Sequence, residues 1–145
     1  MAEKSANQID ATLEDFFKKM PPLPPNAVDA IFKITPWLAL IFGILGVIGA
    51  LSAFGILTAL SPFALMAGAH NWGLGIFAAA GWLISSVLML LAYPGLKAGK
   101  LNGWNMLFWS EVVNVVASVI GISVSSIIGA AIGFYLIYQI KPKYK

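Results

Sequence analysis

Glu111 is the only acidic residue between positions 34 and 140 of this chain. Asn114 and Ser118 follow it at spacings that share one face of a helix, and Ser110 precedes it directly. A charged side chain at the centre of a membrane helix costs roughly 2.5–3.5 kcal/mol, so such a group points into a bundle or toward a partner. Burial also disfavours the charged form of a carboxyl. These four residues are the candidate intramembrane polar site.

Two interpretations of this site stay open. In the first, a protonated Glu111 and Asn114 hydrogen-bond across helices and hold the bundle together, with Ser52, Ser85 or Ser86 as partners. In the second, Glu111 binds and releases a proton or a cationic ligand during transport. The sequence offers no lysine at the same depth to pair with the acid.

Other classes of chemistry are disfavoured by composition. The chain has no cysteine and one histidine, His70, so thiolate sites, disulfides and multi-histidine metal or haem sites are excluded. All nine basic residues are lysines, which argues against nucleic-acid binding. No pair of carboxylates and no serine–histidine–acid set lies at a common depth. We therefore expect no catalytic residues, no cofactor and no metal.

The element that must position Glu111 is a membrane helix. Of the 145 residues 59% are hydrophobic, and the mean hydropathy is +0.85. The stretch 34–140 holds three charges, Lys97, Lys100 and Glu111. A soluble domain of this size cannot bury so much apolar surface, so the solvent must be lipid. The fold class is therefore an all-α membrane protein.

Residues 1–33 predict a cytoplasmic arm. An amphipathic helix over 6–20 is followed by a proline-rich spacer at 21–25 and a juxtamembrane helix over 26–33. We expect this arm either to lie on the membrane surface or to dock on a partner protein. Its apolar face would be formed by Ile9, Leu13, Phe16, Phe17 and Met20.

Residues 34–145 predict a four-helix transmembrane domain, with spans at about 37–60, 72–93, 104–120 and 123–140. Ser61-Pro62 should end the first span and Pro94-Gly95 the second. The apolar run from 104 to 140 would measure about 55 Å as one helix, well beyond a hydrocarbon core of roughly 30 Å. We therefore divide it by a turn near residues 121–123.

The lysines agree with an even number of crossings. They precede the first span, lie between the second and third, and follow the fourth, at positions 4, 18, 19, 33, 97, 100, 141, 143 and 145. The positive-inside rule then places both termini in the cytoplasm. The sequence predicts a four-transmembrane-helix bundle with an N-terminal cytoplasmic amphipathic helix.

Small residues predict where the helices pack. One set lies on the first span and the other on the fourth, and such ridges let helix backbones approach closely. They could join the four helices of one molecule or form a homo-oligomer interface. The sets are Gly43, Gly46 and Ala50, and Ser125, Gly129 and Gly133.

Three short motifs run along the chain: Pro36-Trp37-Leu38, Pro94-Gly95-Leu96-Lys97 and Gly103-Trp104. In this pattern the chain resembles uncharacterised small bacterial four-helix integral membrane proteins. The resemblance implies the bacterial cytoplasmic (inner) membrane and no known activity. We expect a non-enzymatic structural or accessory subunit that assembles with itself or with a larger membrane complex. The alternative is a small proton-coupled transporter or channel that uses Glu111.

Overall fold

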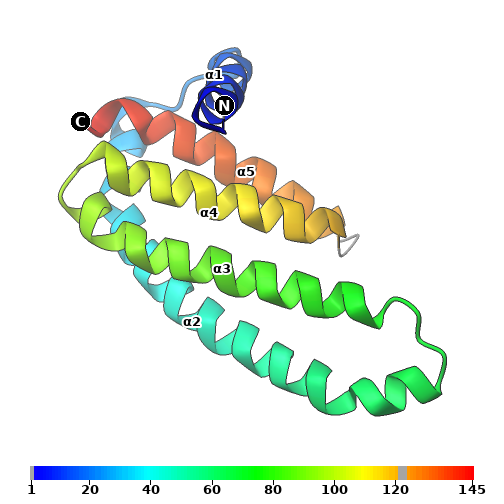
Figure 1. The fold of residues 1–145 in the computed structure, drawn as a ribbon. Helices are drawn as coiled ribbons and strands as arrows, with labels where there is room; N and C mark the ends of the chain where they lie inside the picture. The colour runs from blue at the N-terminus through cyan, green and yellow to red at the C-terminus, as the bar shows by residue number, and fades with distance from the viewer. Residues whose placement is uncertain (1, 121–123) are drawn as a thin grey trace.

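The computed structural model describes residues 2–120 and 124–145, which form helices and their connections with no strand among them. Figure 1 shows the order of the helices along the chain. They are α1 (Ala2–Lys18), α2 (Pro25–Met66), α3 (Trp72–Lys97), α4 (Leu101–Ile120), α5 (Val124–Ile140) and a short 3-10 helix η1 (Lys141–Lys143).

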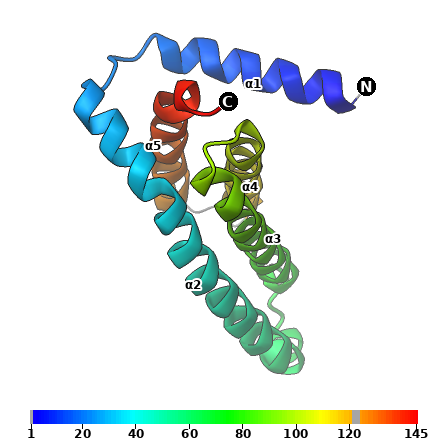
Figure 2. The same ribbon diagram turned by 90° about the vertical axis from the view of Figure 1, so that its left-hand side faces the viewer.

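The long helices pack as successive antiparallel neighbours. α2 runs along α3, α3 along α4, and α4 along α5, whereas α2 and α5 meet over a much shorter length (Figures 1 and 2). α1 crosses over the C-terminal end of α5 (Figure 2). The arm, the α3–α4 turn and the C-terminus therefore share one end of the bundle (Figure 1).

Three helical segments are long and apolar enough to cross a membrane: Pro25–Met66, Trp72–Lys97 and Val124–Lys143. An all-helical membrane protein is thus supported by composition and structure together. α4 is long enough but less apolar than these segments, because its 20 residues include Asn102, Asn105, Glu111 and Asn114. It packs between α3 and α5, so much of its surface faces protein rather than surroundings.

The prediction that Ser61-Pro62 ends the first span is wrong, because α2 continues through Pro62 to Met66. A proline removes the donor that would bond the carbonyl four residues earlier, here Thr58. The Ser61 hydroxyl donates to the Thr58 carbonyl oxygen at 2.8 Å instead. A neighbouring side chain thus satisfies the freed backbone group and the helix persists. Figure 1 shows α2 bending toward this end.

Other helix limits also differ from those predicted. The juxtamembrane helix and first span form one helix, because Pro36 is accommodated inside α2. α3 likewise passes through Pro94 and ends at Lys97. The arm helix begins at Ala2 and ends at Lys18, earlier than the predicted 6–20. The predicted turn at 121–123 lies outside the described residues.

The best-packed part of the core lies at the end that carries α1. Trp104 is fully buried, stacks on Phe108 and donates its indole N–H to the Ile137 carbonyl at 2.9 Å. Its helix approaches α3 at Gly95 and Gly103, where a Cβ at position 95 would lie 2.6 Å from Gly103 Cα. The missing side chains therefore allow the α3–α4 turn to close tightly.

Candidate functional site

Glu111 lies on the face of α4 that meets α5. Its side chain is only 9% exposed, although no charge stands beside it in the described structure. The carboxyl occupies the space in which Gly133 has no side chain: a Cβ there would lie 2.6 Å from Glu111 Oε1. Gly133 is thus the residue that makes room for the acid between two helices.

The Glu111 carboxyl also borders a cavity of about 170 Å³. The cavity lies where α2, α4 and α5 converge, and Met89 of α3 closes one side. Thr35 is the other lining residue with a polar side chain, and its hydroxyl donates to the Ile31 carbonyl at 2.6 Å. Glu111 has no hydrogen bond or ion pair within residues 2–120 and 124–145. Its carboxyl therefore faces an apolar space without an internal partner.

Asn114 does not join Glu111. It is half-buried and lines a second cavity of about 330 Å³ together with Ser85, Ser86 and Trp82. Phe42 and Met89 line both cavities, so they stand between the two polar groups.

The two candidate serines of α4 are buried and bond to their own helix. Ser110 is fully buried and its hydroxyl donates to the Leu107 carbonyl at 2.7 Å. Ser118 is buried too, and its hydroxyl donates to the Asn114 carbonyl at 2.8 Å. Both hydroxyls donate their proton within their own helix, so toward a ligand they could act only as acceptors.

The cross-helix bonds predicted for Glu111 and Asn114 do not form with the serines named for them. Ser85 donates to the Ser110 carbonyl at 2.7 Å and so ties α3 to α4. Ser86 and Ser52 each donate to the carbonyl four residues earlier in their own helices. Among these serines, the contact between helices is therefore from a hydroxyl to the backbone, because a serine on a helix readily finds a carbonyl acceptor.

The small residues of α2 pack inside the molecule. A Cβ at Gly43 would lie 2.7 Å from Leu90, one at Gly46 would collide with Ser86, and Ala50 is fully buried. This ridge is the α2–α3 contact. Of the three small residues predicted to pack in α5, Gly133 packs against Glu111, whereas Ser125 is exposed and Gly129 has open space at its Cβ position.

Sequence analysis missed a cluster of charged and aromatic residues where the arm meets the bundle. Lys141 forms ion pairs with Asp10 at 3.0 Å and with Glu14 at 2.8 Å. Its ammonium also lies 4.6 Å from the centre of the Trp104 ring. The Tyr138 hydroxyl donates to Asp10 at 2.8 Å. The arm thus docks on its own bundle.

Apolar contacts support the same docking. Phe17 is buried and stacks on Tyr138 with ring centres 5.3 Å apart. Leu13 and Met20 are half-buried, whereas Ile9 and Phe16 of the predicted apolar face are exposed. The acidic residues at positions 10 and 14 were the available signal, since they lie beside Leu13 and Phe17 on the docked face.

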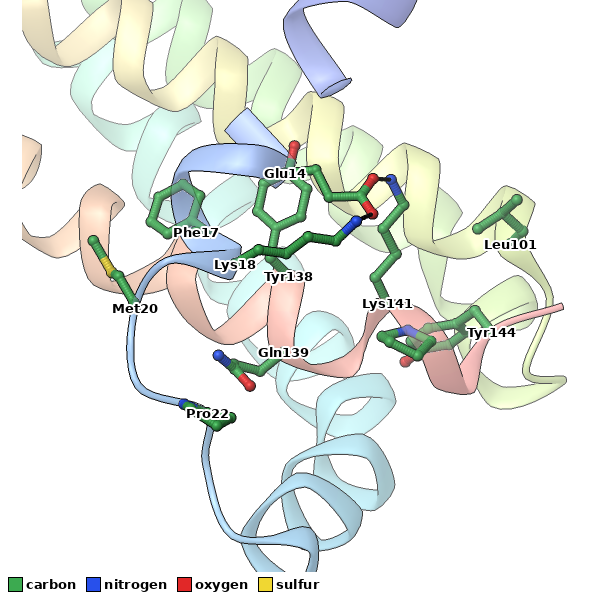
Figure 3. A pocket seen from close by; sticks show the side chains of 11 residues that line it. Glu14, Phe17, Lys18, Met20, Pro22, Leu101, Tyr138, Gln139, Lys141 and Tyr144 are labelled. Carbon is green, nitrogen blue, oxygen red and sulfur yellow. Dashed lines mark hydrogen bonds and ion pairs between the residues drawn. The ribbon is translucent and has the colours of Figure 1, made fainter. Parts of the chain in front are cut away.

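Figure 3 shows this junction, a groove of about 600 Å³ between the arm and the end of the bundle. Glu14 accepts bonds from both Lys141 and Lys18. The hydrogen bond from Lys141 lowers the pKa of Glu14 below its ordinary value of 4.5, and the bond from Lys18 adds a smaller effect in the same direction. Burial raises the pKa of Tyr144, at the edge of the groove, to about 12.

No group of three or more histidine, aspartate and glutamate side chains in the described ranges could hold a metal ion. Comparison of the chain with protein-family models, curated proteins and solved structures finds no significant match.

Proposed function

We propose that this chain is a four-span protein of the bacterial cytoplasmic membrane that acts as a non-enzymatic accessory subunit of a larger membrane assembly. Both termini lie on the cytoplasmic side. We take α4 as the fourth span, since it packs along α3 and α5 and its 20 residues measure about 30 Å, a full hydrocarbon thickness. The common end of the arm, the α3–α4 turn and the C-terminus supports the even number of crossings (Figure 1).

The length of α2 is the observation that carries the accessory role. Its uncharged part, Ile34 to Met66, measures about 50 Å at 1.5 Å per residue. To fit it into a hydrocarbon core of about 30 Å the helix would have to tilt by more than about 50°, beyond the usual range of membrane helices. Because Lys33 favours the cytoplasmic interface at the near end, we place the far end of α2, beyond its bend, past the hydrocarbon layer.

That far end is apolar and uncovered. Phe63, Leu65 and Met66 are 69%, 73% and 87% exposed. The following connection to α3 carries no charge and contains Gly68 with φ of 73°. Large apolar side chains outside the lipid mark a surface that another protein covers. We assign the α2–α3 tip as the contact with the partner subunit.

The test is gentle purification from native membranes followed by mass measurement of the intact assembly. The tip variant Phe63→Ala/Leu65→Ala/Met66→Ala should lose the additional mass that the native chain retains. The control is Ile44→Ala/Ile48→Ala/Leu51→Ala, which removes similar exposed side chains from the middle of α2. A native chain that purifies as a lone monomer, or equal losses in both variants, would overturn the proposal.

A second candidate function rests on the unpartnered carboxyl of Glu111. In this alternative the chain is a small proton-coupled transporter or channel, and Glu111 exchanges its proton during transport. Glu111→Gln separates the two roles, because Gln keeps hydrogen-bonding capacity but cannot release a proton. Transport requires that pH-dependent flux into vesicles is lost in this variant. Unchanged flux would exclude it, and normal assembly of the variant agrees with the accessory role.

A further inference from the structure

The cavity beside Glu111 is lined mostly by apolar side chains and by one carboxyl. Residues of α2, α4 and α5 supply an apolar lining that includes Ala39, Leu107 and Leu136. The carboxyl of Glu111, which is nine-tenths buried, is the polar group on this lining whose bonding capacity is unused within the described residues. The Thr35 hydroxyl is already bonded to its own helix. A ligand for this space must therefore be mostly hydrocarbon with one group that suits a carboxyl.

The charge of the Glu111 carboxylate determines which polar group the ligand should carry. An anionic ligand would be repelled by the carboxylate, and a hydrocarbon would leave it unsatisfied at considerable cost in an apolar site. A protonated amine supplies both the opposite charge and N–H donors, and such charge-assisted bonds are about twice as strong as neutral ones. The site thus complements a single ammonium attached to an apolar body.

Size and access limit the body of the ligand. A cavity of 170 Å³ is slightly larger than the roughly 150 Å³ cavity that accommodates benzene in a protein interior. Leu38 and Phe42 line the cavity and are also 41% and 59% exposed on the outer surface of α2. A molecule dissolved in the lipid could therefore enter between α2 and α5, which pack together over only a short length.

We propose that this cavity binds small lipophilic amines of about the size of benzylamine, with Glu111 as the counter-ion. Binding needs neither a partner subunit nor movement of the amine across the membrane. The proposal therefore stands apart from the accessory role, and either one can fail while the other holds.

The experiment measures equilibrium binding to the full chain in lipid nanodiscs, with protein-free nanodiscs subtracted. The probe is benzylamine and the neutral control is benzyl alcohol, which has nearly the same shape. The native chain should prefer the amine by at least about tenfold, since the two differ by one charge-assisted bond. Glu111→Gln should remove this preference while still binding both weakly. Equal affinity for the two probes, or an unchanged preference in Glu111→Gln, would overturn the proposal.

Two filling variants test the location. Ala39→Leu should abolish binding of both probes because the added carbons occupy the cavity, and Leu136→Phe provides the same test from α5 if the first variant does not fold. Gly129→Ala is the matched control, since that position has open space and lies off the cavity. Circular dichroism and a single elution peak verify folding. Full binding by a folded, filled variant would place the amine elsewhere and contradict the assignment.

Discussion

Glu111 on α4 and Gly133 on α5 fit together as carboxyl and gap: a Cβ at position 133 would lie 2.6 Å from Glu111 Oε1. Real Cβ contacts are essentially never that short. Gly129, one turn earlier on the same helix, has open space where its Cβ would be. Two glycines of one predicted ridge therefore have different surroundings, and substitution can tell them apart.

We expect Gly133→Ala to push the Glu111 carboxyl toward the cavity and to be less stable than Gly129→Ala by about 1 kcal/mol, since the end of a flexible side chain must move to make room. Gly129→Ala should keep the native stability or raise it by up to about 1 kcal/mol, because the added methyl group meets nothing and alanine is the better helix former. The measurement is the unfolding midpoint of both variants in one detergent, followed by circular dichroism. Equal effects at the two positions would contradict the close fit.

The bond from Ser61 to the Thr58 carbonyl predicts a coupling with Pro62. Ser61→Ala should cost about 1 kcal/mol of stability, because it leaves the carbonyl without its donor. In a Pro62→Ala background the same change should cost little, since the new backbone N–H at position 62 can bond that carbonyl. A double-mutant cycle on unfolding midpoints measures the difference. Equal costs in both backgrounds would show that the hydroxyl does not replace the missing donor.

Lys141 should hold the arm against the bundle. Lys141→Met keeps the apolar stem but removes the charge that pairs with Asp10 and Glu14, so we expect α1 to leave α5. The chain has no cysteine, so spin labels at Asn7→Cys and Ala98→Cys report the distance without interference. The distribution of distances between the two labels should be narrow in the native chain and broad in Lys141→Met.

The control for this prediction is Lys19→Met. Lys19 lies just beyond α1 on an exposed position and forms no ion pair in the part of the chain described. Its variant should keep the narrow distribution. If both lysine variants broaden it alike, total charge rather than the Lys141 contact governs docking.

Glu14 makes the docking dependent on pH. Because docking lowers the pKa of Glu14 below 4.5, the docked arm gains stability when the group is ionised, above the pKa of the free arm. This contribution is lost as the pH falls through the lower, docked pKa. The label distance should therefore stay constant from about pH 7 to about pH 5 and broaden below that. Glu14→Gln should show a weaker response, and an unchanged acid transition in that variant would assign it to another group.

The sequence allowed the apolar helices to be located, because long uncharged runs bounded by lysines permit few alternatives. It misjudged Pro62, because the rule that proline ends a helix considers the lost donor and not a neighbouring hydroxyl that replaces it. The limits at Pro36 and Pro94 were also misjudged, since α2 and α3 continue through these prolines; there the described residues include no side-chain donor to the freed carbonyl.

The candidate site could be predicted only in part. Helical spacing identified Glu111 as buried, but it assigned Asn114 to the same partner surface. In the bundle these two residues face different cavities, because packing against Phe42 and Met89 divides the space between the helices. The acidic residues on the apolar face of the arm hinted at docking, but the partner of Asp10 is Lys141, far away in the chain, and no local pattern identifies it.

The segment after α5 returns to close a turn made much earlier. The Lys145 N–H donates to the Gly99 carbonyl at 3.0 Å, and the Leu101 N–H donates to the Lys145 carbonyl at 2.9 Å. The Gly99 carbonyl and the Leu101 N–H thus depend on one distant residue for these bonds, so removal of Lys145 would leave both groups of the α3–α4 corner to find other partners.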